Sequence, residues 1–348
     1  MTEDSLNEFS SLEIEPLIAA LPADPRDSSR LLAVRRSDGG LLHKRFGDLP
    51  ELLGPDDMLV LNRSKVWKAR LEALKATGGK SEILLMAPAG AGNSLWTGLC
   101  RKIVPGQVLT CPGGLKAECV ARNEDGSYTF RFSAPVDEAW LAANGEVPLP
   151  QYILKARKRR GVGALPDEPN YQTVYAAEAG SIAAHTAGFH FTPELFSRLA
   201  ARGVKTAFVT LHIGWGTFKP VRSEDPAAHV MMEEACCVPA DTAAAINAHR
   251  AAGGRIIAVG TSSMRTLETF SDEKGVVGSG SGRAGLFIRP GYRFKVAGAF
   301  ITNLHVPDSA PLYMTAAFAG RELLLKAYTE AVKEKYRFYS YGDSMLIY

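Results

Sequence analysis

The sequence predicts an α/β protein with a small all-β unit inserted into it. Strand-like and helix-like segments alternate before about residue 62 and after about residue 148, a pattern typical of α/β folds. Between them, short apolar runs follow one another without a helical period, which indicates a small barrel or sandwich. The length of 348 residues also favours two domains over one.

The first part of the α/β domain is expected to contain strands at 31–34 and 58–61, with a short helix at 46–53. Turn dipeptides such as Pro-Gly and Asp-Gly then separate six expected strands, at 69–75, 81–87, 95–101, 107–111, 115–122 and 127–132. We therefore place the inserted domain at 66–147 and the large domain at 1–65 and 148–348.

The second part of the α/β domain opens with clear helix signals. Thr192 is a good N-cap, Pro193 suits the first helical position and Gly203 suits the end of a helix at 194–202. The elements expected next are a strand at 205–211, a helix at 242–252 capped by Asp241, and a strand at 255–259. Residues 280–285 match the dinucleotide pattern GxGxxG, but no helix is expected after them, which favours a flexible loop.

The composition is that of an ordinary globular protein. The net charge of +3 neither requires nor excludes a nucleic-acid partner. Five cysteines without a CxxC pair argue against a zinc ribbon and for reduced thiols. The acidic N-terminus lacks signal-peptide features, and no run approaches the roughly 18 apolar residues of a membrane span. We expect a cytoplasmic protein without a membrane partner.

Residues 180–221 gather three of the seven histidines. His190 and His212 lie in the glycine-rich runs AGFHFT and LHIGWGTF, and imidazole titrates near neutrality, so both are candidate acid–base groups. Buried structural histidines are the alternative. A metal site is not expected, because no HExxH motif or cysteine at ligand spacing occurs.

Three further segments carry candidate binding groups. In IIAVGTSSMRTLE, the hydroxyls of Thr261, Ser262 and Ser263 would lie in a loop at a helix start and Arg265 would add a positive charge, which suits a carboxylate, phosphate or ribose; simple capping is the alternative. Asn303 and His305 follow an expected strand. A cationic run could contact a phosphate backbone or be a solvated loop; it comprises Lys155, Arg157, Lys158, Arg159 and Arg160.

These segments together resemble one family, the S-adenosylmethionine:tRNA ribosyltransferase-isomerases of queuosine synthesis. The resemblance rests on the motifs PLPQYI, YQTVYA, TAGFHFT, TLHIGWGTF, VGTSSMRTLE, FITNLHVPDS and YRFYSYGDSMLI, in this order. It implies a large, barrel-like α/β domain with an inserted β-barrel domain. It also implies that S-adenosylmethionine donates its ribosyl group, as a co-substrate and without a metal, to a 7-aminomethyl-7-deazaguanine in tRNA. Epoxyqueuosine would form as adenine and methionine leave, after deprotonation of the carbon beside the sulfonium.

The resemblance also implies roles for residues. His190, His212 and Glu234 would be catalytic. The substrate would be bound by Asn62, Tyr171, Gln172, Thr186, Gly188, Thr261, Ser262, Ser263, Arg265, Asn303 and His305. The protein is expected to be a monomer or a weak homo-oligomer.

Several positions depart from the family pattern, namely Arg63, His185, Trp215, Met232 and residues 283–285. The family usually has an aspartate at the position of Arg63 and a proline at that of His185. These changes leave two alternatives open: a paralogue that binds the same donor but uses another acceptor or only cleaves the donor, and a non-catalytic nucleic-acid-binding protein.

Overall fold

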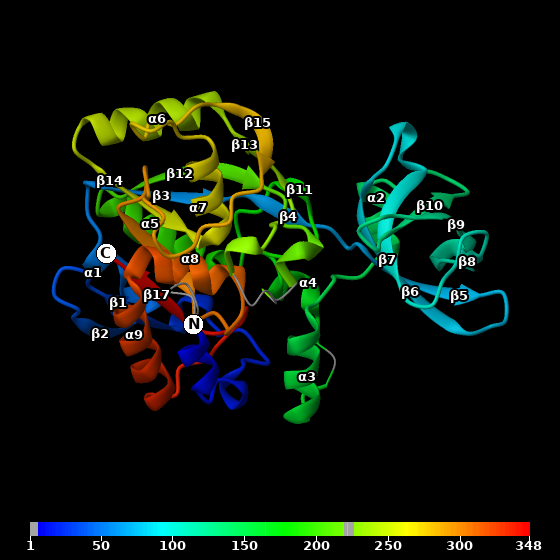
Figure 1. Cartoon of the computed structure of the whole chain (residues 1–348), viewed down its shortest axis with the longest axis horizontal. Coiled ribbons are helices and arrows are strands. Elements are labelled where there is room, and N and C mark those ends of the chain that lie inside the picture. The colour runs from blue at the N-terminus through cyan, green and yellow to red at the C-terminus, as the bar shows by residue number, and fades with distance from the viewer. Residues whose placement is uncertain (1–5, 164, 219–220, 222–225) are drawn as a thin grey trace.

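The centre of the molecule is a nine-stranded sheet (Figure 1). The computed structural model describes residues 6–163, 165–218, 221 and 226–348. The sheet has the order β15-β13-β12-β3-β14-β16-β17-β1-β2. Its strands are β1 (Arg30–Val34), β2 (Leu41–Arg45), β3 (Asp57–Asn62), β12 (Lys205–Leu211), β13 (Glu234–Val238), β14 (Arg255–Val259), β15 (Gly280–Ala284), β16 (Ala299–Asn303) and β17 (Ser344–Ile347).

The middle strands β12, β3, β14 and β16 are parallel. Every residue of β3 and β16 is buried, as expected when both faces of a parallel sheet are covered. Side chains alternate between two cores: Val60 and Ala258 pack on one face, whereas Leu59 and Ile257 pack on the other.

Helices cover both faces of this sheet. The apolar residues of α6 (Ala240–Ala251), α7 (Gly260–Thr269), α8 (Ala310–Ala319) and α9 (Arg321–Lys333) join the first core. Those of α1 (Leu49–Leu52) and α5 (Pro193–Ala201) join the second. In α5, the predicted cap is present, because the Thr192 side chain accepts a hydrogen bond from the Leu195 amide.

A closed six-stranded barrel stands to one side of the sheet (Figure 1). Its strands are β5 (Arg70–Lys75), β6 (Lys80–Pro88), β7 (Leu95–Cys100), β8 (Val108–Thr110), β9 (Lys116–Arg122) and β10 (Tyr128–Phe132). It has its own core, with Trp96 and Phe130 fully buried. The strands lie within the predicted inserted domain; the boundaries 66–147 themselves stay a prediction.

Short elements join the two parts. After the barrel come α2 (Glu138–Asn144), α3 (Gln151–Arg159) and α4 (Asp167–Asn170). The strands β4 (Ser64–Val66) and β11 (Glu178–Ser181) pair as a two-stranded parallel ribbon. No helix of the described residues is long and apolar enough to cross a membrane.

The α/β class with an inserted β-barrel is confirmed, and four details differ from expectation. The large sheet is open within the described residues, with β15 and β2 at its edges, and is not barrel-like. The expected loop at 280–285 is largely strand β15, because its backbone pairs with β13. Helix α7 begins at Gly260 with no loop after β14. Helix α6 begins at Ala240, so Asp241 lies in its first turn and is not its cap.

Candidate active site

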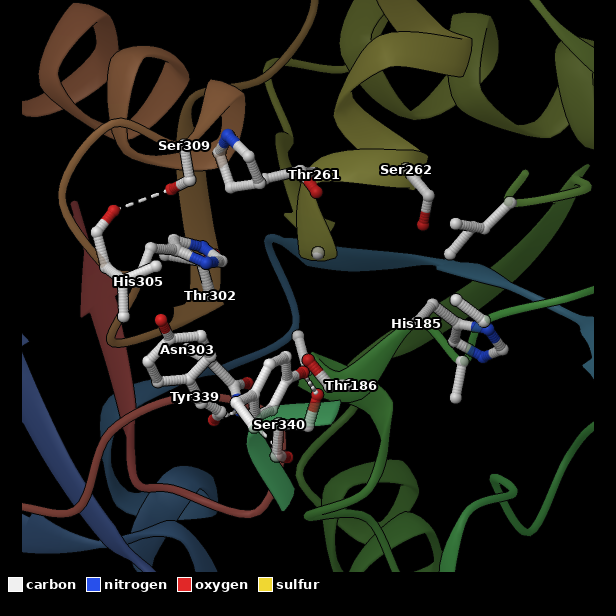
Figure 2. A pocket seen from close by; sticks show the side chains of 18 of the residues that line it. His185, Thr186, Thr261, Ser262, Thr302, Asn303, His305, Ser309, Tyr339 and Ser340 are labelled. Atoms are coloured by element: carbon white, nitrogen blue, oxygen red, sulfur yellow. Dashed lines mark hydrogen bonds between the residues drawn. The ribbon is translucent and has the colours of Figure 1, made fainter. Parts of the chain in front are cut away.

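A cavity lies at the ends of three parallel strands of the sheet (Figure 2). Ile213 follows β12, Gly260 follows β14, and Asn303 is the last residue of β16. In open α/β sheets, ligands bind beyond the carboxyl ends of the strands. The rest of the wall comes from residues 183–187, 305–311 and 339–340, together with Tyr152 and Tyr171. All seven motifs, which are distant from one another in sequence, therefore meet at the place where this fold binds ligands.

The first turn of α7 forms one wall. Thr261 and Ser262 line the cavity, and the N-cap residue Val259 supplies no side-chain hydrogen bond to the helix. The first amides of a helix lack intrahelical acceptors and carry partial positive charge. The Ser262 hydroxyl is buried without a hydrogen-bond partner in the described part of the chain. This turn can therefore bind a carboxylate or a hydroxyl-bearing ligand.

Two imidazoles line the cavity, those of His185 and His305. His185 is 4% exposed, and neither of its ring nitrogens has a hydrogen-bond partner among the described residues. His305 Nε2 lies 2.6 Å from Thr302 Oγ1. Burial lowers the pKa of each ring to about 3, so both are neutral at pH 7. Neutral rings allow a cationic ligand to enter without like-charge repulsion.

Tyrosines supply the aromatic part of the wall (Figure 2). The rings of Tyr152 and Tyr339 lie 4.1 Å apart, and Tyr152 Oη shares a hydrogen bond of 2.5 Å with Ser340 Oγ. Tyr171 is 1% exposed and also lines the cavity. Aromatic faces attract cations and stack on planar groups. This wall therefore suits a ligand that carries a positive charge and a heterocyclic base.

His190 lies behind the wall and not in the cavity. Its Nδ1 is 2.7 Å from Ser29 Oγ, its Nε2 is 3.3 Å from Asn303 Oδ1, and its ring stacks on Phe46. Burial lowers its pKa to about 4. Both ring nitrogens are already engaged, so the geometry favours a positioning role over proton transfer.

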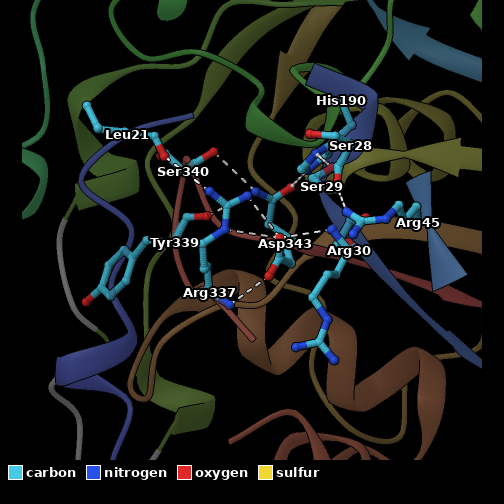
Figure 3. A network of polar contacts seen from close by, with 12 residues as sticks. Leu21, Ser28, Ser29, Arg30, Arg45, His190, Arg337, Tyr339, Ser340 and Asp343 are labelled. Carbon is cyan, nitrogen blue, oxygen red and sulfur yellow. Dashed lines mark hydrogen bonds and ion pairs between the residues drawn. The ribbon is translucent and has the colours of Figure 1, made fainter. Parts of the chain in front are cut away.

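Through its contact with Asn303, His190 helps to position the C-terminal segment that carries Tyr339. The Asn303 amide donates to the carbonyl oxygens of Tyr339 and Ser340, at 3.0 and 3.3 Å. Asp343 holds the same segment from the other side by accepting hydrogen bonds from the Arg337 amide and side chain (Figure 3). The C-terminal segment that carries Tyr339 is thus fixed by buried polar contacts.

His212 also lies outside the cavity. Successive residues of an extended chain point to opposite sides, and Ile213 takes the side facing the cavity. The His212 ring instead packs on Gly180, where an added Cβ would lie 2.6 Å from Nδ1. Burial lowers the pKa of His212.

Four of the predicted substrate-binding residues contact other parts of the protein and not the cavity. Asn62 forms three hydrogen bonds with the backbone of Ser64 and Leu211. The Gln172 amide pairs with the backbone of Val66. Gly188 leaves room for a tyrosine, since a Cβ there would lie 2.1 Å from Tyr175 Oη. Ser263 is fully buried, and none of these four residues lines the cavity. Of the predicted set, Tyr171, Thr186, Thr261, Ser262, Asn303 and His305 do line it.

A second cavity adjoins the first and shares Ile213, Thr261, Ser262 and Pro311 with it. Glu234 and Arg265 lie in its wall and are joined at 2.6 Å. Glu234 Oε1 also accepts a hydrogen bond from the Gly214 amide, and Arg265 donates to the Ala284 carbonyl. The charge of Arg265 is therefore already balanced by the Glu234 carboxylate. The two residues form a structural ion pair at the edge of the site.

The cationic run forms the end of helix α3 and is not a loop. Arg157 is buried and makes a two-pronged ion pair with Asp167. Arg159 bonds to Glu15, and Arg160 bonds to the carbonyls of Pro16 and Ile18. Only Lys155 and Lys158 are exposed without a partner in the described chain. The buried Arg157 side chain therefore stabilises the fold and is not available to a phosphate.

The positions that depart from the family pattern are spread over the molecule. Arg63 pairs with Glu178, and Arg283 pairs with Glu233, both at the surface. Met232 packs on Gly216, where a Cβ would lie 2.8 Å from Sδ. Only His185 lines the main cavity.

Among the described residues, no group of three or more histidine, cysteine, aspartate or glutamate side chains could hold a metal ion. The expectation that the reaction needs no metal stays a prediction.

Comparison with known proteins identifies the family. A family model described as "Queuosine biosynthesis protein" matches residues 8–347. The chain belongs to this family. The S-adenosylmethionine:tRNA ribosyltransferase-isomerase of Trichlorobacter lovleyi is 44% identical over 346 residues, which is 98% of this chain and 99% of that protein. The protein of the same name from Thermus thermophilus is 49% identical over 342 residues, 95% of each chain.

A solved structure agrees with this assignment to the queuosine biosynthesis family. The crystal structure of S-adenosylmethionine tRNA ribosyltransferase from Thermotoga maritima is 34% identical, with a TM-score of 0.54, and the match covers 97% of this chain and 98% of that one. The resemblance found in the sequence motifs is therefore confirmed.

Sequence reasoning missed several residues of the cavity in this queuosine-family protein. The C-terminal motif YRFYSYGDSMLI carries no predicted site residue, yet it brings Tyr339 and Ser340 into the wall. Tyr152 was passed over beside the cations of α3, and His185 was noted only as a departure. A polar residue next to the TAG motif was the one available signal for His185.

Proposed function

We propose that this protein transfers and isomerises the ribosyl group of S-adenosylmethionine onto a 7-aminomethyl-7-deazaguanine in tRNA, releasing adenine and methionine. The reaction would take place in the cytoplasm, and the enzyme would be a monomer or a weak homo-oligomer. The observation that carries the proposal is the cavity beyond β12, β14 and β16, in which seven family motifs meet. Full-length relatives with this activity in their name support it.

The wall of the cavity fits the donor chemically. The aromatic faces of Tyr152 and Tyr339 suit the sulfonium or the adenine. The free amides and the Ser262 hydroxyl at the start of α7 suit the methionine carboxylate. Neutral His185 and His305 add hydrogen-bonding nitrogens without adding positive charge near the sulfonium.

We assign proton removal to His305 in place of His190 and His212. In the tautomer that carries its proton on Nε2, His305 donates to Thr302 and keeps a lone pair on Nδ1 for the donor carbon. The sulfonium makes the proton on the neighbouring donor carbon acidic, so a weakly basic imidazole can remove it. Thr302 would hold the tautomer, as the orienting partner of a general base does.

The function is tested with the unaltered protein, S-adenosylmethionine and tRNA that carries the 7-aminomethyl-7-deazaguanine. Adenine, methionine and modified tRNA should appear together. Release of adenine without modified tRNA would favour a paralogue with another acceptor, and no release would refute the enzymatic proposal.

Filling the cavity should block donor binding. Ser262→Leu places a larger side chain between the two cavities, and overpacking of about 1–3 kcal/mol predicts roughly 10- to 100-fold weaker S-adenosylmethionine binding by calorimetry. Ser197→Leu, on the exposed face of α5, is the matched control and should bind normally. Equal affinity of the two variants would mean that the donor binds elsewhere.

Removing the proposed base should slow chemistry more than binding. His305→Ala is expected to lower adenine release roughly 10²-fold or more at saturating donor. His43→Ala, at a partly exposed surface site next to Tyr336, should leave the rate unchanged. Turnover of His305→Ala close to normal would show that another group accepts the proton.

A further inference from the structure

The barrel carries a large groove of about 1180 Å³ that the donor site does not use. Its walls come from β5, β6, the end of β7 and the end of β8. Gln151, the first residue of α3, closes one side of the groove. The groove thus lies on the face of the barrel that meets the large domain.

The groove is connected to the active-site cavity. It shares Glu82, Leu84 and Gln151 with a cleft between the barrel and the large domain. That cleft in turn shares Tyr152, Val306, Ser309 and Tyr339 with the main cavity. A chain-like ligand whose one end enters the cavity can therefore continue through the cleft and along the barrel.

The groove is rich in cations. Lys75, Lys80, Arg101 and Lys102 line it, against two carboxylates, Glu72 and Glu82. Glu82 is already paired with Arg70 at 2.7 Å. Lys80, Arg101 and Lys102 are exposed, and no carboxylate of the described chain pairs with them. Unpaired cations along a groove favour a polyanion, because each phosphate bound releases a counterion.

We infer that this barrel groove binds the phosphate backbone of the tRNA strand whose modified nucleoside enters the cavity. The inference rests on the proposed function and assigns its second substrate to a surface. The nucleoside would pass through the cleft, whose walls combine proline and aliphatic side chains with Tyr152 and Tyr339. The flanking phosphates would meet Lys80, Arg101 and Lys102. Such contacts position the strand and carry no base information.

The end of α3, the surface first expected to meet tRNA, fits this task less well. Three of its five cations are engaged within the protein. Lys158 follows Gln151 by seven residues, about 10 Å along a helix, which takes it away from the groove.

The test compares two charge reversals of the same residue type in the barrel. Arg101→Glu lies in the groove, whereas Arg122→Glu lies at the end of β9, outside it. We expect Arg101→Glu to raise the Kd for unmodified tRNA transcript roughly tenfold, with the slope of log K against log salt reduced by about 1. Arg122→Glu should change the Kd less than about twofold, the level of a distant charge. Both variants should bind S-adenosylmethionine as the unaltered protein does.

The outcomes separate the inference from the proposed function. If both variants bind tRNA equally well and the unaltered protein still modifies tRNA, the groove assignment is wrong and the function stands. If the unaltered protein does not modify tRNA, the function itself fails. Should Arg101→Glu not fold, Lys80→Ala combined with Lys102→Ala gives the same comparison with a milder change, and an unchanged salt slope there contradicts the assignment.

Discussion

Replacing Glu234 with alanine is expected to destabilise the protein by about 3–5 kcal/mol. Glu234 and Arg265 are 6% and 7% exposed and lie 2.6 Å apart. Removing the carboxylate leaves the guanidinium buried without its counter-charge and leaves the Gly214 amide without its acceptor. Urea unfolding followed by circular dichroism measures the loss.

The neighbouring residue provides the control. Glu233 pairs with Arg283 at the surface, where both side chains are more than half exposed, so Glu233→Ala should cost less than about 1 kcal/mol. Equal losses for the two variants would show that the buried pair contributes nothing special.

A double variant separates stability from binding. Glu234→Leu combined with Arg265→Met replaces the pair by apolar side chains and should recover most of the lost stability. If this variant folds but no longer binds S-adenosylmethionine, the pair also serves the donor site. Normal binding would confine it to a structural role.

Stability should also fall steeply in mild acid. Burial lowers the pKa of His185 and His305 to about 3 and that of His190 to about 4, from 6.5. As the pH falls below 6.5, the unfolded chain takes up a proton at each histidine, whereas the folded chain does not. Protonation therefore favours unfolding, and the loss continues until the pH reaches the folded pKa values.

The size of this effect follows from linkage. Each histidine contributes up to about 1.4 kcal/mol per pH unit, so the three together should remove roughly 5 kcal/mol between pH 6.5 and pH 5. Urea unfolding at a series of pH values measures it. His190→Gln can still hydrogen-bond to Ser29 and Asn303 but does not titrate, so it should show about two thirds of the slope. A flat profile in the unaltered protein would mean that these rings are protonated when folded.

Much of the fold could be predicted because its elements are local in origin. The strands at 205–211 and 255–259 were predicted with the bounds seen in the structure, since each is an apolar run between turn or helix-end residues. The barrel strands match within about two residues, because turn residues mark every boundary. Helix α5 follows from its cap, its proline and its closing glycine.

The errors occurred where pairing or packing acts over long distances. Residues 280–284 look like a flexible loop, yet β13, more than 40 residues earlier, supplies hydrogen-bonding partners that make them a strand. A composition rich in glycine and serine carries no trace of that partner. The first turn of α7 likewise looks like a loop in the sequence, because its small residues have low helix propensity. In the folded protein this turn packs against the sheet, and that packing favours the helix.

The family, the α/β architecture with its inserted barrel and the segments around the active site could all be predicted from the sequence. Those depend on local patterns and on motifs that survive in order. Which side chains of those segments face the cavity is seen only in the folded protein. His190 and His212 have the stronger motifs but point into packed surroundings, whereas His185 and His305 line the cavity. The direction of a side chain depends on the strand register and on the neighbours that fill each face, and a short motif contains information on neither.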